Sequence, residues 1–591
     1  MRIAYVDINK FRGISSARIY LNGHSVIIGD NNAGKSTILE AIDLVLGPDR
    51  LSKTPVIDEH DFYNGIYFTG DDENPKIEIE LLIIDLEPSQ ISRFKNNLEF
   101  WDCSAKQILQ PGSINEVDNS YVKEALRLKF IGSYNQDDDD FEGQTYFCSP
   151  LKDEGQLTKF GKSDKRECGF LYLRALRTGA RALSLERGSL LDIILKIKEL
   201  KPKMWEHVLN QLRVTTVATE PSLGIQDILL GVQEALKEFV PSDWGSEPQL
   251  RVSDLTREHL RKTLTVFMST GEGSYHAPFQ HQGTGTINTM VLALLTMIAE
   301  LKKNVIFAME EPEIAIPPYT QKRIVDSIRR KSTQAIFTSH SPFVLEEFSP
   351  SQIILVQRNK DGQVGSHEVK FPSTIKAKNY SSEFRMRFAE ALLAKRVLLT
   401  EGSTEASSYL ASARRLNELA PTKFKSLEAL GVAVFDVMSE TSIHSFGEYF
   451  TSLGKTVFAV FDKQEKISLE KINKSVPYAF ESKYKGFEDL LLEETDIEVL
   501  KNCYLRLIKD NEWPTHLNNR KASNPEEISL VKDALREYLK WSKGSMGAAE
   551  IIGSCELENH VPKTVRDVLE EVQVIIETGS KSALKSSNET I

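Results

Sequence analysis

The stretch Gly29-Asp30-Asn31-Asn32-Ala33-Gly34-Lys35-Ser36 decides the fold of the first half of this chain. An apolar run precedes it and an amphipathic run over 35–47 follows it, so the sequence predicts a strand, a glycine loop and a helix. The glycines let backbone N–H groups face phosphate oxygens, and the helix N-terminus adds positive partial charge. We expect Lys35 to contact the β- and γ-phosphates of a nucleotide and Ser36 to hold Mg²⁺. The remaining residues assigned to this nucleotide site are Asn31, Asn32, Gly34 and Thr37.

Two carboxylates follow a second apolar strand, predicted over 305–309. The end of a parallel strand beside the phosphate loop is where hydrolysis of ATP needs acids, so we assign Glu310 to the Mg²⁺ shell and Glu311 to the attacking water. Aspartate would be the more usual residue at 310, and glutamate keeps the charge on a longer arm. His340, at the tip of the next predicted strand, is expected to sense the γ-phosphate.

A glycine loop, QGTG, supplies Gly283 and Gly285 before a helix predicted over 288–302. The order of phosphate loop, helical segment over 180–240, glycine loop, strand–Glu–Glu and strand–His resembles the ATPase heads of the ABC class, such as those of SMC and RecF. In those heads a glycine-bearing loop of one protomer faces the nucleotide of the other, although the usual LSGGQ pattern differs here. The resemblance therefore implies a homodimer or a higher homo-oligomer, and it places Arg12 near the nucleotide.

A second set of acids lies near the ends of strands in the C-terminal half. Glu401 ends the strand predicted over 396–400, and Glu405 follows one helical turn later on the same side. Asp462 ends the strand TVFAVF, and the strand GVAVFDV lies between the two in sequence. Three carboxylates at the tips of a parallel sheet form a cage of hard oxygen ligands for Mg²⁺ or Mn²⁺, as phosphodiester hydrolysis requires.

This second segment resembles the TOPRIM fold, whose second motif is DxD, whereas this chain has Gln464 at the third position. An ABC-type head joined to a TOPRIM unit resembles the OLD family (overcoming lysogenisation defect) of ATP-dependent nucleases, which act in anti-phage defence. The resemblance rests on GDNNAGKS, LRALRTGARALSLERGSLLD, HQGTGTINTM, MEEPE, TSHSPF, TEGSTE and VFDKQ. It implies metal ligation by Glu401, Glu405, Asp462, Gln464 and Glu488, with Lys543 as the catalytic lysine.

Composition and charge exclude several protein classes. The chain has 591 residues and a net charge of −11, which argues against a protein that coats nucleic acid by bulk charge. Five scattered cysteines without a CxxC pair make a disulfide framework or zinc module unlikely and fit the reducing cytoplasm. The longest apolar run, 290–299, is too short to span a bilayer.

A local basic segment could still contact DNA. Residues 159–187 hold eight basic and three acidic side chains, a net of +5, with Arg174, Arg177 and Arg181 as candidate DNA contacts. The alternative is a solvated face or a set of intramolecular ion pairs. Residues 133–157, with the acidic run Asp137 to Asp140, are expected to form a loop.

We therefore expect an α/β chain with four parts. These are the first part of an ABC-type ATPase (1–165), a helical dimerisation insertion (166–255), the second ATPase part (256–375) and a TOPRIM nuclease with helical C-terminal elements (390–591). The leading hypothesis is an ATP-regulated, metal-dependent DNA endonuclease. A sensor ATPase with a degenerate TOPRIM unit and a RecF-like clamp that does not cut remain open, as does a helicase or reverse transcriptase partner.

Overall fold

The computed structural model describes two compact units, and each is treated by itself. The described residues are 1–579 except 49–54, 71–73, 111–117, 119, 151–156, 175–183, 187–188, 215–224, 240–255, 270–275, 302–304, 315, 370–381 and 544–546. The first unit comprises Met1–Ile27, Gly34–Ser339 and Arg358–Gly365. The second comprises Ile28–Ala33, His340–Gln357 and Ser366–Ile591.

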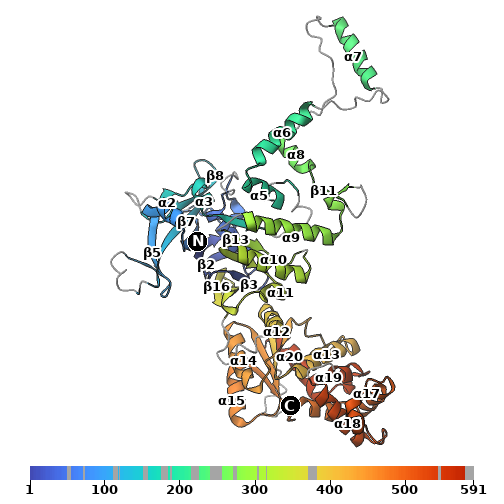
Figure 1. Ribbon diagram of the computed structural model, residues 1–591. Helices are drawn as coiled ribbons and strands as arrows, with labels where there is room; N and C mark the ends of the chain where they lie inside the picture. Colours follow the sequence, from blue (N-terminus) through green and yellow to red (C-terminus); the bar gives the residue numbers. More distant parts are fainter. Residues whose placement is uncertain are drawn as a thin grey trace. The chain divides into compact units, whose positions relative to one another are not determined.

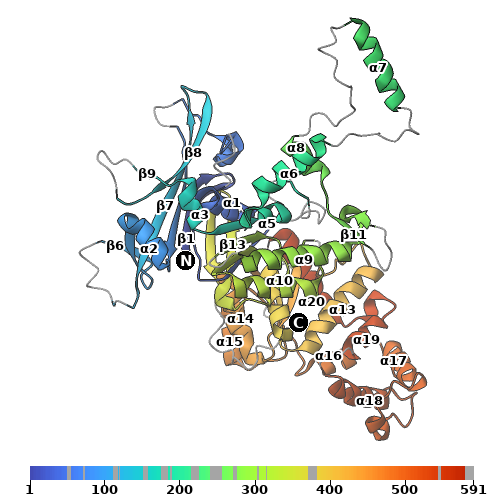
Figure 2. The same ribbon diagram turned by 45° about the horizontal axis from the view of Figure 1, so that its top comes forward.

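A run of parallel strands forms the centre of the first unit. Its order is β10 (Phe170–Leu173), β13 (Ile306–Glu310), β14 (Gln334–Thr338) and β3 (Ser25–Ile28). Every residue of β13 and β14 is buried, as the near-continuous apolar sequences of strands covered on both faces predict. Helix α1 (Lys35–Leu46) contacts β10 and β13, and α9 (Thr284–Leu301) packs on α10 (Pro318–Lys331), as Figures 1 and 2 show. Helix α9 begins four residues before the predicted start.

Antiparallel strands continue the first unit. They run in the order β2 (Ile14–Tyr20), β1 (Arg2–Phe11), β4 (Ile77–Ile84), β7 (Val122–Asn135), β5 (Leu98–Asp102) and β6 (Gln107–Leu109), with β16 (Gln363–Glu368) parallel to β2. The predicted loop over 133–157 is wrong in part, because β8 (Asp140–Phe147) pairs with β7 and then with β9 (Thr158–Lys159). The acidic run fills the turn of this hairpin up to Asp139, and Asp140 begins β8; all four side chains are exposed, so the adjacent like charges remain solvated.

Helices occupy most of the described part of 190–239, as the three- and four-residue apolar spacing over 180–240 predicted, and one further helix lies after the predicted segment. They are α5 (Leu190–Ile197), α6 (Lys201–Val214), α7 (Ile225–Phe239) and α8 (Arg257–Thr263). Trp205 and Leu209 of α6 form a small separate core with Leu260 of α8. The short elements of the first part of the chain are α2 (Pro88–Phe94), α3 (Lys162–Glu167), β11 (Phe267–Ser269) and β12 (His276–Pro278), and α11 (Pro342–Leu345) and β15 (Ile353–Arg358) follow β14.

The second unit is built on a four-stranded parallel sheet. Its order is β18 (Val432–Asp436), β17 (Arg396–Thr400), β19 (Thr456–Phe461) and β20 (Tyr478–Glu481). Helices α12 (Ser382–Leu393) and α14 (Ile443–Ser452) pack on the face that carries Phe435, and α13 (Ser403–Leu419) packs on the face that carries Leu398. Helix α15 (Lys466–Ser475) joins β19 to β20. Because all four strands are parallel, their carboxyl ends meet at one edge.

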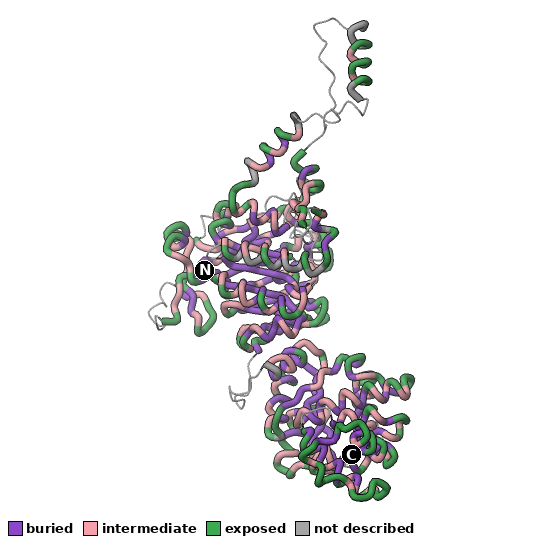
Figure 3. The backbone as a smooth tube through the Cα atoms, turned by 45° about the vertical axis from the view of Figure 1, so that its right-hand side comes forward, coloured by how far each residue is buried: buried purple, intermediate pink, exposed green. Residues whose placement is uncertain are grey.

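The chain after β20 is helical, as predicted for 485–591 as far as the described residues extend. It contains α16 (Phe487–Glu494), α17 (Ile497–Lys509), α18 (Ile528–Trp541), α19 (Gly547–Gly553) and α20 (Lys563–Thr578). These helices share one apolar core with α13 and the sheet. Buried backbone lies inside each unit in Figure 3. None of the helices within the described ranges has the length and apolar character needed to cross a bilayer.

Candidate functional site

The start of α1 carries the residues predicted to bind phosphates. Gly34 caps the helix with φ 93°, a left-handed conformation that glycine adopts without strain. Lys35 is 7% exposed and Ser36 is exposed at the first turn. Helix α1 contacts β13, whose last residue is Glu310. The helix that begins with Lys35 therefore packs on the strand that ends in Glu310.

The two acids after β13 differ in their surroundings. Glu310 is 9% exposed, and the hydroxyl of Tyr172 on β10 donates a hydrogen bond to its Oε1. Burial, followed by the negative charge of Glu310, raises the pKa of Tyr172, so the phenol keeps its proton. Glu311 is less buried and has φ 41°, with its N–H donating to the Thr338 carbonyl at 2.9 Å. The left-handed turn at Glu311 ends the strand and separates the two carboxylates.

Arginines surround Glu40, which lies one turn after Ser36 on α1. Arg12 forms an ion pair with Glu40 and donates from Nε to Asp61 at 2.8 Å. Arg174 lies 3.8 Å from Glu40, and its guanidinium is 5.8 Å from the centre of the Tyr172 ring. The proposed DNA contact Arg174 therefore lies beside the nucleotide-site helix.

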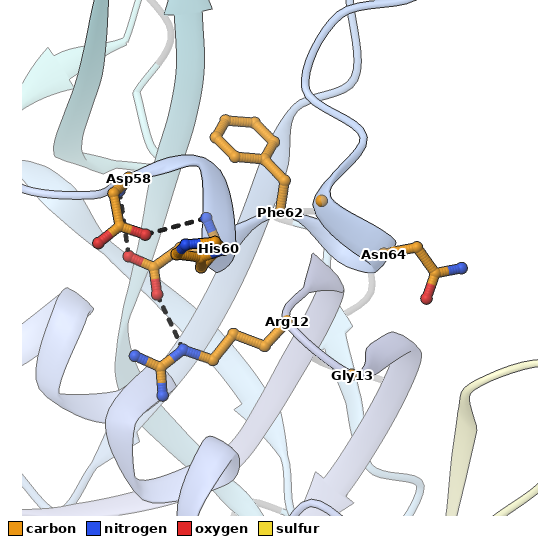
Figure 4. Close-up of a pocket in the computed structure, with 8 residues that line it drawn as sticks. Arg12, Gly13, Asp58, His60, Phe62 and Asn64 are labelled. Carbon is orange, nitrogen blue, oxygen red and sulfur yellow. Dashed lines mark hydrogen bonds and ion pairs between the residues drawn. The ribbon is translucent and has the colours of Figure 1, made fainter.

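A hollow of 530 Å³ opens beside Arg12. Figure 4 shows Arg12 reaching toward the acidic turn that follows Asp58, with Phe62 and Asn64 farther along the same segment. Asp58 caps this turn through the N–H of His60 at 2.9 Å. The hollow combines a cation, acids and an aromatic side chain, which are groups that can contact a nucleoside.

The other residues predicted to contact the nucleotide differ in their exposure and in the elements that carry them. Asn31 and Asn32 are exposed, and Asn32 has φ 68°. Gly283 is exposed and directly precedes α9, and its carbonyl accepts from the N–H of Thr286 at 3.0 Å. His340 is exposed and directly follows Ser339 in the chain. Thr37 is half-buried in the first turn of α1, and Gly285 lies in the first turn of α9.

Only part of the predicted basic segment can be located. Arg177 and Arg181 lie outside the described residues. Lys165, another member of that segment, is fully buried and donates to the Leu44 carbonyl at 2.8 Å. Lys165 therefore stabilises the end of α1 and is unavailable to DNA.

The carboxyl edge of the sheet in the second unit carries most of the predicted metal ligands. Glu401 directly follows β17, and Asp462 directly follows β19, which is its neighbour. Glu405 lies in the first turn of α13, and Glu488 lies in the first turn of α16. Gly402 allows Glu405 a close approach, because a Cβ at position 402 would lie 2.9 Å from its Oε2.

Neutral donors orient the carboxylates of Glu401 and Glu481. The Asp462 N–H donates to Glu401 Oε1 at 3.1 Å, and Gln464 Nε2 donates to the same oxygen at 2.9 Å. Gln464 also donates from its backbone N–H to Glu481 at the end of β20, at 2.8 Å. Gln464 is therefore an integral part of this edge, although it carries no charge.

The acids at this edge of the sheet repel one another electrostatically. Burial, then the charges of Glu401, Glu405 and Glu488, raise the pKa of Asp462 to about 7. Burial and the charge of Glu488 also raise the pKa of Glu405. Lys543 opposes both shifts, and its Nζ lies 3.8 Å from Glu488 Oε1 with the side chain 72% exposed. A cation at this edge would relieve the repulsion.

The donor set fits a hard divalent cation. Carboxylate and amide oxygens are its preferred ligands, and Gln464 Oε1 is buried without a hydrogen-bond partner among the residues that the structure describes. Over the same residues, no three His, Cys, Asp or Glu side chains are already arranged around an ion position. Glu401 Oε1 accepts hydrogen bonds from the Asp462 N–H and from Gln464 Nε2, and these two donors fix the direction of the Glu401 carboxylate.

Sequence reasoning missed three residues at these two sites. Asp436 ends β18 beside Glu401, is 8% exposed, and lies 3.4 Å from Arg387. An apolar strand followed by an acid could have identified it. Glu481 is hydrogen-bonded to Gln464, and Tyr172 is hydrogen-bonded to Glu310. Both contacts depend on which strands become neighbours in the sheet, and no local sequence pattern indicates that.

Comparisons with known proteins cover both units. The AAA ATPase domain model matches residues 1–159 and 195–345. The TOPRIM domain model of proteins like the overcoming lysogenization defect protein matches residues 392–463.

Individual relatives are distant. The Old nuclease of Escherichia phage P2 is 22% identical over 443 residues, covering 72% of this chain and 72% of the relative. The endonuclease GajA of Bacillus cereus is 23% identical over 429 residues, covering 68% of this chain and 66% of the relative. The solved C-terminal region of the Burkholderia pseudomallei OLD protein covers 31% of this chain and 98% of its own, at 13% identity and a TM-score of 0.25.

The ATPase model spans more than half of the chain, and the TOPRIM model begins four residues before β17 and ends at the residue after Asp462. The chain is therefore an α/β protein with an ATPase domain followed by a TOPRIM domain. The chain belongs to the OLD family, and it is an ATPase and a nuclease.

Proposed function

We propose that this protein is an ATP-regulated, divalent-metal-dependent DNA endonuclease that acts in anti-phage defence. The observation that carries the proposal is the group of acids Glu401, Glu405 and Asp462 at one sheet edge, with Lys543 beside them. The same chain carries a phosphate loop, which supports control by ATP. The relatives named nuclease and endonuclease support the reaction class, and the defence role rests on the family resemblance.

The residues at the sheet edge have separate roles in cleavage. Mg²⁺ or Mn²⁺ held by Glu401, Glu405, Asp462, Gln464 and Glu488 would stabilise the attacking and leaving oxygens of a phosphodiester. Lys543 extends into solvent and would meet the negative charge of the scissile phosphate. Glu488 Oε1 lies 3.8 Å from the Lys543 ammonium and would keep this cation near the acids and within reach of the substrate.

In the ATPase unit, we assign the phosphates to Lys35 and the metal ion to Ser36 and Glu310. Glu311 orients the attacking water, and His340 senses the γ-phosphate. Further contacts to the nucleotide are assigned to Arg12, Asn31, Asn32, Gly34, Thr37, Gly283 and Gly285. The hollow beside Arg12 has the volume to accept a nucleoside.

The wider organisation follows from the family resemblance. We propose a homodimer or higher homo-oligomer with 166–255 as the dimerisation insertion between ATPase parts 1–165 and 256–375, and with the nuclease over 390–591. Arg174, Arg177 and Arg181 are proposed to contact DNA. The free cysteines in the described residues support a cytoplasmic setting.

A sensor ATPase with a degenerate TOPRIM unit is the second candidate. Gln464 favours it, because an amide at the third position of the second motif removes one negative charge from the metal site. The oxygen of Gln464 can still ligate, which favours the nuclease.

Cleavage of supercoiled plasmid separates the two candidates. The wild type, Lys35→Ala and Glu401→Ala proteins are incubated with Mg²⁺ or Mn²⁺, with and without ATP. Cutting that needs Glu401 and changes with ATP or at Lys35 supports the gated nuclease. ATP turnover without cutting, also after addition of cell extract as a source of a helicase or reverse transcriptase, supports the sensor.

A further inference from the structure

Glu310 occupies a position where a shorter aspartate would be more usual, and its longer side chain has one more rotatable bond. A glutamate that must hold a metal ion at a fixed point therefore needs a second contact to order its carboxylate. The end of β13 fixes the backbone of Glu310, because β13 pairs with both β10 and β14. The side chain requires an anchor of its own.

Strand pairing brings Tyr172 to the correct face for that contact. Tyr172 on β10 is directly opposite Ala308 on β13, and Glu310 lies two residues beyond Ala308. Alternate residues of a strand share a face, so Tyr172 and Glu310 point to the same side of the sheet. A tyrosine is long enough to reach the diagonal position, and its hydroxyl donates to Glu310 Oε1.

The surroundings hold the tyrosine ring in place. The guanidinium of Arg174 lies 5.8 Å from the ring centre, and Arg174 pairs with Glu40 of α1 at 3.8 Å. Helix α1 contacts both β10 and β13, so the ring lies between the sheet and the helix that begins with Lys35. The phenol has one proton to donate, so Tyr172 orders one carboxylate oxygen of Glu310, Oε1.

We propose that Tyr172 is a positioning residue that fixes the Glu310 carboxylate for the divalent ion bound with ATP. This inference rests on the proposed role of Glu310 in the metal shell. Tyr172 touches neither nucleotide nor metal. The hydrogen bond from Tyr172 lowers the entropic cost of ordering the Glu310 side chain, so Tyr172 contributes to metal affinity and to the rate of ATP hydrolysis. Tyr172 makes no contribution to nucleotide binding in the absence of metal.

The test measures the ADP-dependent binding of Mn²⁺ by electron paramagnetic resonance on the full chain, as the difference between protein with and without saturating ADP, because the acids at the sheet edge of the second unit are also proposed to bind Mn²⁺. Tyr172→Phe should weaken Mn²⁺ binding on the order of tenfold, the effect of losing one hydrogen bond to a charged group. ADP affinity in EDTA should be unchanged, and kcat for ATP should fall on the order of tenfold in the same variant. A merely structural role would change neither the Mn²⁺ affinity nor the split between metal-dependent and metal-free binding.

Tyr5→Phe is the matched control, because Tyr5 is buried and donates to Glu80 at 2.5 Å elsewhere in the same unit. It should lower the melting temperature and leave Mn²⁺ affinity unchanged. In a Glu310→Asp background the shorter arm cannot reach the phenol, so Tyr172→Phe should have no further effect.

The outcomes separate a failure of the nucleotide-site assignment from a failure of the proposed role of Tyr172. A wild type that does not bind Mn²⁺ with ADP overturns both the nucleotide-site assignment and this inference. A wild type that binds normally, with Tyr172→Phe unchanged, overturns the inference alone. Equal effects of Tyr172→Phe and Tyr5→Phe, or additive effects of Tyr172→Phe and Glu310→Asp, also overturn it.

Discussion

Replacing Asp462 by asparagine should stabilise the metal-free protein and abolish cleavage. Asp462 lies at the end of β19 among the charges of Glu401, Glu405 and Glu488, and burial adds to the cost of ionising it. Asparagine has nearly the same shape and carries no charge, so the repulsion disappears while the Asp462 backbone N–H can still donate to Glu401. Asp462→Asn should therefore remove DNA cleavage and raise the stability of the metal-free protein.

The magnitude and its pH dependence follow from the raised pKa of Asp462. The value rises from 3.8 to about 7, which corresponds to an upper limit of about 4 kcal/mol. Partial exposure of the carboxyl to water reduces this figure to about 2 kcal/mol. The folded protein retains the proton between pH 4 and 7 while the unfolded chain loses it. The free energy of unfolding therefore falls as the pH rises through this window, and the loss is complete above pH 7.

Hydrogen exchange of β17 and β19 amides in EDTA measures this free energy locally, so the other unit does not contribute. At pH 8 the Asp462→Asn variant should gain about 2 kcal/mol of protection over the wild type, and at pH 5 less than half of that. Mg²⁺ should restore protection to the wild type at pH 8 and have no effect on the variant. Asp533→Asn is the control, because Asp533 is 71% exposed and pairs with Arg536, one turn further along the same helix.

Two results would refute the reasoning. Equal protection of the wild type and Asp462→Asn at pH 8 would mean that the acids do not repel one another. A gain that is the same at pH 5 and pH 8 would mean that the effect comes from packing or backbone propensity, since neither depends on the ionisation of a carboxyl.

Three further predictions concern single residues. Lys35→Ala should abolish ATP binding measured by calorimetry, because a buried ammonium at the helix start provides the main charge for the phosphates. Gln464→Glu should place a carboxylate against Glu401, so it should lower metal-free thermal stability and strengthen Mn²⁺ binding. Lys543→Ala should slow plasmid cleavage on the order of a hundredfold and change the melting temperature little, because its side chain is mostly exposed.

The sequence predicted the positions of the candidate sites because each depends on a local pattern. An apolar run followed by an acid indicates the end of a buried strand, and this pattern identified Glu310, Glu401 and Asp462. The glycine loop before an amphipathic run identified the start of α1. The predicted loop over 133–157 failed because β8 is polar on its exposed face and its pairing with β7 depends on tertiary contacts.

The partners of these acids were not predictable, because they depend on which strands become neighbours. Residues 172 and 310 are far apart in sequence, and β10 precedes a helical segment that gives no indication of the strand it will pair with. Gln464 was identified as a departure from a motif, whereas its contacts to Glu401 and Glu481 required the order β17-β19-β20. The type of each side chain can be read from the sequence at that position, whereas the order of strands in a parallel sheet depends on contacts between distant segments.

The contacts to the two sets of acids suggest how a carboxylate at a strand end is kept available for a cation. Tyr172 orients Glu310, and the Asp462 N–H and Gln464 orient Glu401. These donors are neutral, so they fix the direction of a carboxylate without cancelling its charge. Glu40 and Glu99, by contrast, receive arginines, which satisfy both direction and charge. At Glu310 and Glu401 the neutral donors therefore fix the direction of the carboxylate and bring no positive charge to it, and Asp436 and Glu481 at the ends of neighbouring strands receive neutral donors as well.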